Sequence, residues 1–118
     1  MRTVAIIQAR MGSTRLPGKV MKKLCGKSVL EHVTRRVQAC LLLDDVVVAT
    51  TAAPSDDVIV AEAVQCGAKW FRGSEDDVLD RYYRAAKQYH ADVVVRVTAD
   101  CPLFDPELLE EMILSFRN

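Results

Sequence analysis

The sequence predicts an α/β protein with a doubly wound parallel sheet. Three apolar runs rich in β-branched residues lie at 3–7, 46–50 and 93–97, and amphipathic segments with helical spacing lie between them. The runs are continuously apolar, as in strands that helices cover on both faces. Strands that alternate with helices along a chain form parallel sheets with right-handed connections. With 118 residues, the chain has the length of one domain.

Start and stop signals predict one helix before the second strand and one helix after it. Ser28 and Glu31 have the spacing of a capping box, which marks the start of the first helix. Ser55 is expected to open the second helix, which runs to about Cys66 and ends at Gly67. The apolar positions behind the capping box are Leu30, Val33 and Val37.

The second half of the chain predicts a weaker strand and two further helices. The strand lies at 69–71, and Ser74 is expected to cap the helix that follows. Aspartates at 76–77 suit the first turn of that helix, where the helix dipole favours acids. An Asp-Pro pair at 105–106 is expected to start the last helix. The apolar positions expected to be buried are Val78, Leu79, Tyr82 and Ala86 in the third helix, and Leu108, Leu109, Met112, Ile113 and Phe116 in the fourth.

The strand at 93–97 is expected at an edge of the sheet, because no further strand signal follows it. Two explanations stay open. Either the chain pairs with another copy, as in a homodimer, or it is the first part of a longer architecture.

Composition points to a cytoplasmic protein with no membrane partner. No apolar run approaches the roughly 20 residues that span a bilayer. Arg10 interrupts the apolar stretch near the N-terminus, so the pattern of a signal peptide is missing. The four cysteines are widely spaced without a close pair, which predicts neither a zinc site nor a disulfide.

The net charge of zero hides an uneven distribution. Residues 1–36 carry nine lysines and arginines against one acid, a net +8, whereas residues 37–118 carry seven against fifteen, a net −8. The first third is therefore expected to face a polyanion. Aromatic residues make up only 6% of the chain, whereas nucleic-acid binders interleave basic and aromatic side chains, so we expect no nucleic-acid partner. The basic residues expected only to solvate the surface are Lys22, Lys23, Arg35 and Arg36.

The loop at 8–19 is the most distinctive segment. Its glycines and proline allow an irregular path that brings backbone N–H groups close to a ligand. Arg10, Arg15 and Lys19 supply fixed positive charge that suits an anion. Because ligands of parallel sheets bind beyond the carboxyl ends of the strands, we interpret this loop as a phosphate-binding loop.

Spacing excludes two common phosphate-binding motifs. Five residues separate Gly12 from Gly18, where a Walker A motif has four, and Val20 stands where Ser or Thr would bind magnesium. The GxGxxG fingerprint of dinucleotide-binding sheets is absent. The chain is therefore predicted to be neither a P-loop NTPase nor an NAD enzyme.

Asp100 follows the strand at 93–97 and is the candidate metal ligand. A cationic loop suits a nucleoside triphosphate whose α-phosphate is attacked, and this reaction needs both positive charge and a divalent metal. Arg10 and Lys19 would supply the charge, and Asp100 would hold Mg2+ at the same edge of the sheet. The alternative is that Asp100 only hydrogen-bonds the backbone of a turn.

Four segments of the chain carry a family resemblance. They are residues 6–19 (IIQARMGSTRLPGK), 48–51 (VATT), 71–83 (FRGSEDDVLDRYY) and 96–103 (RVTADCPL). In this order they resemble the cytidylyltransferases that activate acidic sugars, such as 3-deoxy-manno-octulosonate cytidylyltransferase and acylneuraminate cytidylyltransferase. The resemblance is greatest to the branch of spore coat polysaccharide biosynthesis protein F.

The resemblance implies a Rossmann-like sheet of the nucleotide-diphospho-sugar transferase fold. Residues 1–118 would form its N-terminal, nucleotide-binding part, shorter than the family's usual length. It implies that Arg10 and Lys19 are catalytic residues on the triphosphate and that the backbone near Gln8 and Ala9 meets the base. The residues then expected to bind the nucleotide are Gln8, Ala9, Arg10, Gly12, Ser13, Arg15, Lys19, Gly73 and Ser74, and the expected Mg2+ ligand is Asp100.

Three functions follow from these motifs. The first is a Mg2+-dependent transfer of CMP from CTP to a sugar in surface-polysaccharide synthesis, with CTP and the sugar acceptor as partners. The second is a glycosyltransferase of the same fold that uses a nucleotide-sugar donor. The third is a fragment that binds nucleotide without turnover.

Overall fold

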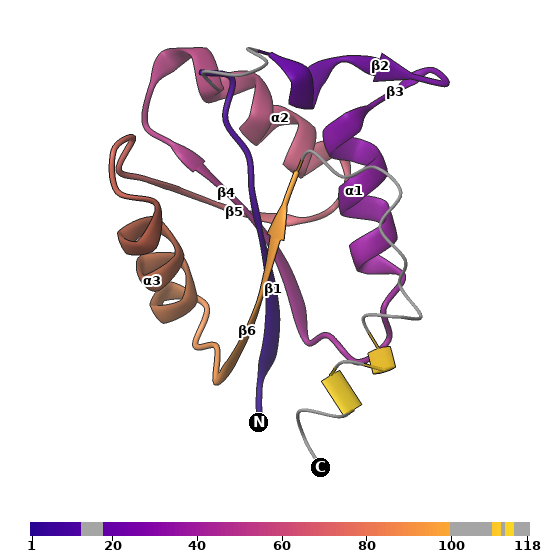
Figure 1. The fold of residues 1–118 in the computed structure, drawn as a ribbon, viewed down its shortest axis with the longest axis vertical. Helices are drawn as coiled ribbons and strands as arrows, with labels where there is room; N and C mark the ends of the chain where they lie inside the picture. The colour runs from indigo at the N-terminus through magenta and orange to yellow at the C-terminus, as the bar shows by residue number, and fades with distance from the viewer. Residues whose placement is uncertain (13–17, 100–109, 112, 115–118) are drawn as a thin grey trace.

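Four parallel strands form the central sheet of the computed structural model, which describes residues 1–12, 18–99, 110–111 and 113–114 (Figure 1). All three strand pairings are parallel, so the predicted parallel sheet is confirmed. In spatial order the strands are β5 (Lys69–Gly73), β4 (Asp45–Thr51), β1 (Thr3–Gln8) and β6 (Val93–Thr98).

Helices cover both faces of the sheet, as the continuously apolar strands predict. On one face, Ala5 and Ile7 of β1 join the core formed with α1 (Val29–Gln38) and α2 (Asp57–Gln65). On the other face, Val4 and Ile6 pack with residues of α3 (Val78–Gln88). Figure 1 shows α3 on the opposite side of the sheet from α1 and α2. Alternate residues of β1 therefore enter two different cores, and the sheet is doubly wound.

The predicted cap of α1 is confirmed. The Ser28 hydroxyl accepts a hydrogen bond from the Glu31 backbone N–H at 2.9 Å. The Glu31 carboxylate pairs with Arg35 one turn later, with 2.7 Å between Oε2 and Nε, and so does not close the capping box. Only half of that motif forms.

A short hairpin precedes this cap and was not predicted from the sequence. It consists of β2 (Lys23–Leu24) and β3 (Lys27–Ser28), paired antiparallel. Cys25 and Gly26 form its turn with φ of 53° and 81°. Positive φ at both turn positions is the geometry that two-residue hairpins require.

The second helix begins later than predicted. Pro54 opens a 3-10 turn, η2 (Pro54–Asp56), and α2 starts at Asp57 rather than Ser55. The carboxylate of Asp56 makes no capping bond to this helix. The predicted end is confirmed, because Gly67 follows the helix with φ of 75°.

The third helix also begins later than predicted. Its cap is Asp77, whose carboxylate accepts the Asp80 backbone N–H at 2.9 Å. The Ser74 hydroxyl instead accepts the backbone N–H groups of Asp76 and Asp77, and so builds the turn before the helix. Leu79 was expected in the core, yet it is 69% exposed because it lies beside the buried face of α3 rather than on it.

The start of the predicted fourth helix, at 105–106, lies outside the described residues. Residues 110, 111, 113 and 114 are helical, and Ile113 is buried beside Cys40. Within the described part of the chain, no helix has the length and apolarity needed to cross a bilayer.

Candidate functional site

The candidate site lies where the four parallel strands end. Gln8 closes β1 and is in register with Ala49 of β4 and Thr98 of β6. The Ala9 N–H donates to the Ala49 carbonyl at 3.1 Å, and the Ala99 N–H donates to the Gln8 carbonyl at 3.0 Å. Both bonds extend the sheet by one residue and fix where the loop after β1 begins. This is the edge at which parallel α/β sheets bind ligands.

A buried aspartate holds the first part of this loop. Asp56 is only 2% exposed, and its Oδ1 accepts the Met11 backbone N–H at 2.7 Å. Its other carboxylate oxygen accepts the hydroxyl of Thr51, the last residue of β4. The Thr51 hydroxyl in turn accepts the Ala53 N–H at 3.2 Å. Asp56 therefore ties the β1 loop to the β4 loop.

The two described ends of the cationic loop are also joined. The Gly18 N–H donates to the Met11 carbonyl at 2.9 Å. Gly18 has φ of 73°, a left-handed conformation that side chains disfavour, so a glycine suits this position. Lys19 then opens the 3-10 turn η1 (Lys19–Met21), which Val20 anchors in the core.

Arg10 connects the loop to the turn before α3. Its Nη1 donates to the carbonyl of Glu75 at 3.2 Å. The preceding carbonyl, that of Ser74, accepts a hydrogen bond from Nη1 of Arg81 at 2.8 Å. Two guanidinium groups from different elements therefore hold adjacent carbonyls of one turn.

Arg81 is an unusual residue for this location. It lies in the first turn of α3 and is 1% exposed, yet it forms no ion pair with any described carboxylate. Burial lowers the pKa of its guanidinium, and the positive charge of Arg10 lowers it further, while Asp56 opposes both effects. The site is therefore cationic at its centre.

Gly73 lets the Arg81 side chain pass close to the end of β5. A Cβ atom at Gly73 would lie 3.3 Å from Cγ of Arg81 and 2.9 Å from Cε1 of Phe71. Its carbonyl accepts the Ala52 N–H at 3.2 Å. The absence of a side chain at Gly73 therefore leaves room for the side chains of Phe71 and Arg81.

The predicted site residues divide into three groups. Gln8, Ala9, Arg10 and Gly12 lie together at the end of β1, and the Arg10 bond to Glu75 links this segment to the turn that contains Gly73 and Ser74. Lys19 lies just beyond the Gly18–Met11 bond. Ser13, Arg15 and Asp100 lie outside the described residues. The binding and catalytic roles of all these residues stay predictions.

A metal site is not defined by the described part of the chain. There, no three His, Cys, Asp or Glu side chains are grouped as metal ligands would be. Asp56 lies at the correct edge, but both of its carboxylate oxygens already accept hydrogen bonds. The only residue predicted to bind Mg2+ from the sequence is Asp100.

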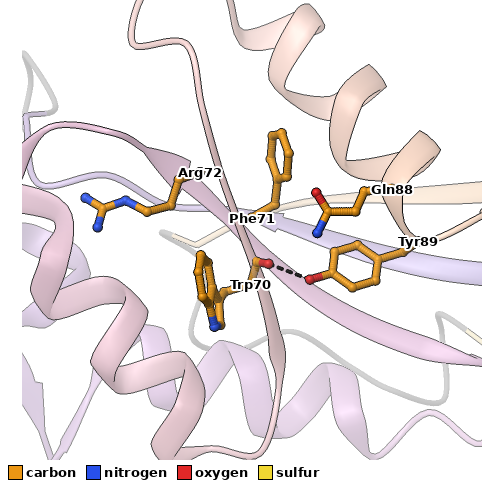
Figure 2. A pocket seen from close by; sticks show the side chains of 5 residues that line it. All are labelled: Trp70, Phe71, Arg72, Gln88 and Tyr89. Carbon is orange, nitrogen blue, oxygen red and sulfur yellow. Dashed lines mark hydrogen bonds between the residues drawn. The ribbon is translucent and has the colours of Figure 1, made fainter.

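A surface hollow of about 450 Å³ lies against β5 and the end of α3 (Figure 2). It is lined by Trp70, Phe71, Arg72, Gln88 and Tyr89. The Tyr89 hydroxyl donates to the Trp70 carbonyl at 2.6 Å, the dashed bond in Figure 2. The hollow is at the opposite end of α3 from the helix cap and contains none of the predicted site residues.

Sequence reasoning missed two residues of the site, Asp56 and Arg81. Asp56 precedes a helix and Arg81 lies within one, so both match ordinary surface patterns. Their burial depends on which strands adjoin, which a single sequence does not specify. One sequence signal was present for Arg81. It is a charged residue on the otherwise apolar, buried face of α3, directly before Tyr82.

The parallel sheet with helices on both faces is the nucleotide-diphospho-sugar transferase fold, as expected. When this chain is compared with the solved structure of a CMP:2-keto-3-deoxy-manno-octonic acid synthetase complexed with CTP, the TM-score is 0.85 and the sequence identity is 27%. The match covers 99% of this chain and 48% of that one.

The family model described as cytidylyltransferase matches residues 4–118, and the chain belongs to that family. A cytidylyltransferase structure from Leptospira borgpetersenii is 41% identical with a TM-score of 0.96, covering 99% of this chain and 49% of that one. The spore coat polysaccharide biosynthesis protein SpsF of Bacillus subtilis is 43% identical over 92% of this chain and 47% of its own length. The predicted resemblance is confirmed, and the chain spans about half the length of the relatives it matches.

Proposed function

We propose that this chain is the nucleotide-binding part of a Mg2+-dependent cytidylyltransferase that transfers CMP from CTP to a sugar. The observation that carries this proposal is the bond from Arg10 to the Glu75 carbonyl. It joins the cationic loop, which lies in the region matched by the family model, to a second loop at the carboxyl edge of the sheet. The sugar would belong to surface-polysaccharide synthesis, as in the name of the Bacillus relative.

The reaction is an in-line displacement at phosphorus. An oxygen of the sugar attacks the α-phosphorus of CTP, the bond from that phosphorus to the bridging oxygen breaks, and pyrophosphate leaves. Arg10 and Lys19 stabilise the negative charge that builds up on the phosphates. Because Asp56 and Gly18 hold the backbone of Met11 on both sides, this charge is positioned before the substrate binds.

The base would lie over the end of β1. The Ala9 N–H is already bonded to Ala49, and the Gln8 carbonyl already accepts the Ala99 N–H. Among the described residues, the Ala9 carbonyl and the Gln8 side chain are the groups of this segment that would contact cytosine.

Asp100 is the residue that would hold Mg2+, since a carboxylate oxygen is a preferred ligand of that ion. When bound, Mg2+ would neutralise phosphate charge and help orient the triphosphate. The engagement of both Asp56 oxygens supports Asp100 rather than Asp56 in this role.

The test measures binding and products separately. Calorimetry with CTP and Mg2+ should give binding, and GTP and ATP should bind more weakly. Pyrophosphate released from CTP in the presence of a sugar panel would support nucleotide transfer. Release of UDP or CMP from a nucleotide-sugar donor would instead support a glycosyltransferase, and no binding of any nucleotide would contradict both.

Nucleotide binding without turnover is the second candidate function. The chain matches about half the length of its relatives, so transfer to a sugar is tested separately from nucleotide binding. Tight CTP binding with no pyrophosphate release across the sugar panel would support this candidate. For both candidate functions we propose that the protein acts in the cytoplasm. Sedimentation would test whether it forms a homodimer.

A further inference from the structure

The guanidinium of Arg81 has a donor without a partner among the described residues. Arg81 is the largest side chain that the described part of the protein buries fully, at 1% exposure. Its Nη1 is bonded to the Ser74 carbonyl, whereas its Nη2 has no hydrogen-bond partner among the described residues. Buried polar groups of folded proteins are nearly always paired, so this exception needs an explanation.

The environment of Arg81 makes its burial unfavourable. A buried charge is tolerated when an opposite charge accompanies it, but no described carboxylate forms an ion pair with Arg81. Burial and the charge of Arg10 lower the pKa of the Arg81 guanidinium, whereas Tyr82 and Asp56 raise it. Asp56 is already bonded to Met11 and Thr51, so it does not complete the site.

The location of Arg81 connects this donor to the candidate site. Arg81 and Arg10 hold the neighbouring carbonyls of Ser74 and Glu75, so their guanidiniums flank one turn. This turn follows β5 at the carboxyl edge of the sheet, where ligands of parallel sheets bind. An oxygen acceptor supplied by a ligand would pair the free donor and offset the repulsion between the two arginines.

We propose that Nη2 of Arg81 donates a hydrogen bond to an acceptor oxygen of the bound nucleotide, which makes Arg81 a ligand-binding residue. This inference rests on the proposed function. The acceptor chemistry is shared by two parts of CTP, a phosphate oxygen and the carbonyl oxygen of the pyrimidine. The fully buried position of Arg81 gives its side chain a defined direction, whereas Arg10 and Lys19 are partly exposed.

The experiment measures binding by calorimetry for three variants. Arg81→Met removes the charge and keeps most of the volume, and Arg81→Lys keeps the charge but loses the planar fork. Arg84→Met is the matched control, because Arg84 lies on the same helix, is exposed and pairs only with Asp80 among the described residues. The probes are CTP, inorganic tripolyphosphate and cytidine.

We expect Arg81→Met to weaken CTP binding by about 10- to 100-fold, the effect of one lost charge-assisted hydrogen bond. Arg84→Met should change it by less than about twofold. A parallel loss for tripolyphosphate, with cytidine unchanged, would assign the bond to a phosphate. A parallel loss for cytidine alone would assign it to the base.

A second measurement separates ligand contact from a structural role. The guanidinium 15N–1H resonances of Arg81, assigned by their loss in Arg81→Lys, should shift when CTP is added to the unmodified chain. The inference is overturned if those resonances stay fixed while CTP binds, or if folded Arg81→Met binds CTP as Arg84→Met does. If the unmodified chain binds no nucleotide, the proposed function fails and this inference fails with it.

Discussion

The carboxylate of Asp56 accepts the backbone N–H of Met11 at 2.7 Å, so a residue after β4 fixes the start of the loop after β1. The second carboxylate oxygen is bonded to the Thr51 hydroxyl, and Asp56 is 2% exposed. Hydrogen bonds to a buried carboxylate are among the stronger ones in proteins. Within the described residues, Met11 at the start of the cationic loop is therefore held by a contact inside the protein.

Replacing Asp56 should disturb both stability and binding. Asp56→Ala leaves the Met11 N–H and the Thr51 hydroxyl without their acceptor, which should lower the free energy of unfolding by about 1–3 kcal/mol. CTP binding should weaken as well, although Asp56 is not expected to touch the nucleotide. Urea denaturation and calorimetry measure the two effects.

Asp57→Ala is the control for this prediction. The adjacent Asp57 carboxylate is 68% exposed and pairs with Arg72 at 2.8 Å, so its loss should cost less than about 1 kcal/mol. Equal losses of stability for the two variants would contradict the anchoring role of Asp56.

The loop cations should contribute to binding and little to stability. Arg10→Ala and Lys19→Ala should each weaken CTP binding by about 10-fold or more, the effect expected from one lost charge-assisted contact to phosphate. The free energy of unfolding should change by less than about 1 kcal/mol, because the hydrogen bond that Arg10 forms with the described residues is an exposed contact to the Glu75 carbonyl. Lys22→Ala, an exposed lysine beside η1, is the control. Unchanged affinity in both site variants would show that the phosphate site is assigned wrongly.

Gly73→Ala should destabilise the protein by crowding. The added methyl group would lie 2.9 Å from Cε1 of Phe71 and 3.3 Å from Cγ of Arg81, so both side chains must shift. Overpacking of this kind costs about 1–3 kcal/mol. Gly12→Ala is the comparison, since no described atom lies within 4 Å of the Cβ position there. The free energy of unfolding should change by less than about 1 kcal/mol in this variant. Thermal unfolding of the two variants without ligand tests the difference.

The sheet was predictable because its signal is local. The run from Val46 to Ala49 is apolar at every position, which is favourable only in a strand covered on both faces. The helix starts were less predictable, because several residues in a row are good caps. Ser74 and Asp77 are both suitable by type, and only the structure shows that the serine forms the preceding turn.

The site was predictable only where its residues are adjacent in sequence. Arg10 and Lys19 belong to one motif, so their chemistry is visible in the chain. The contact of Asp56 with Met11 joins residues 45 positions apart, and the contact of Arg81 with Ser74 joins residues 7 positions apart. Both contacts form only in the folded chain, when the strands are aligned. Tertiary burial of a charge has no periodic signature in a single sequence.

Tyr82 should make stability depend on alkaline pH. Burial raises the pKa of its phenol above the ordinary 10.0, and the nearby Arg96 guanidinium, 4.4 Å from the ring centre, opposes this only in part. The unfolded chain therefore releases the phenolic proton first. The stability is fully present below pH 10.0 and is lost as the pH rises toward the folded pKa. Tyr82→Phe should flatten this loss in urea denaturation between about pH 9 and 11, whereas Tyr83→Phe, at an exposed tyrosine, should retain the wild-type slope. Equal slopes for all three proteins would contradict a raised pKa at Tyr82.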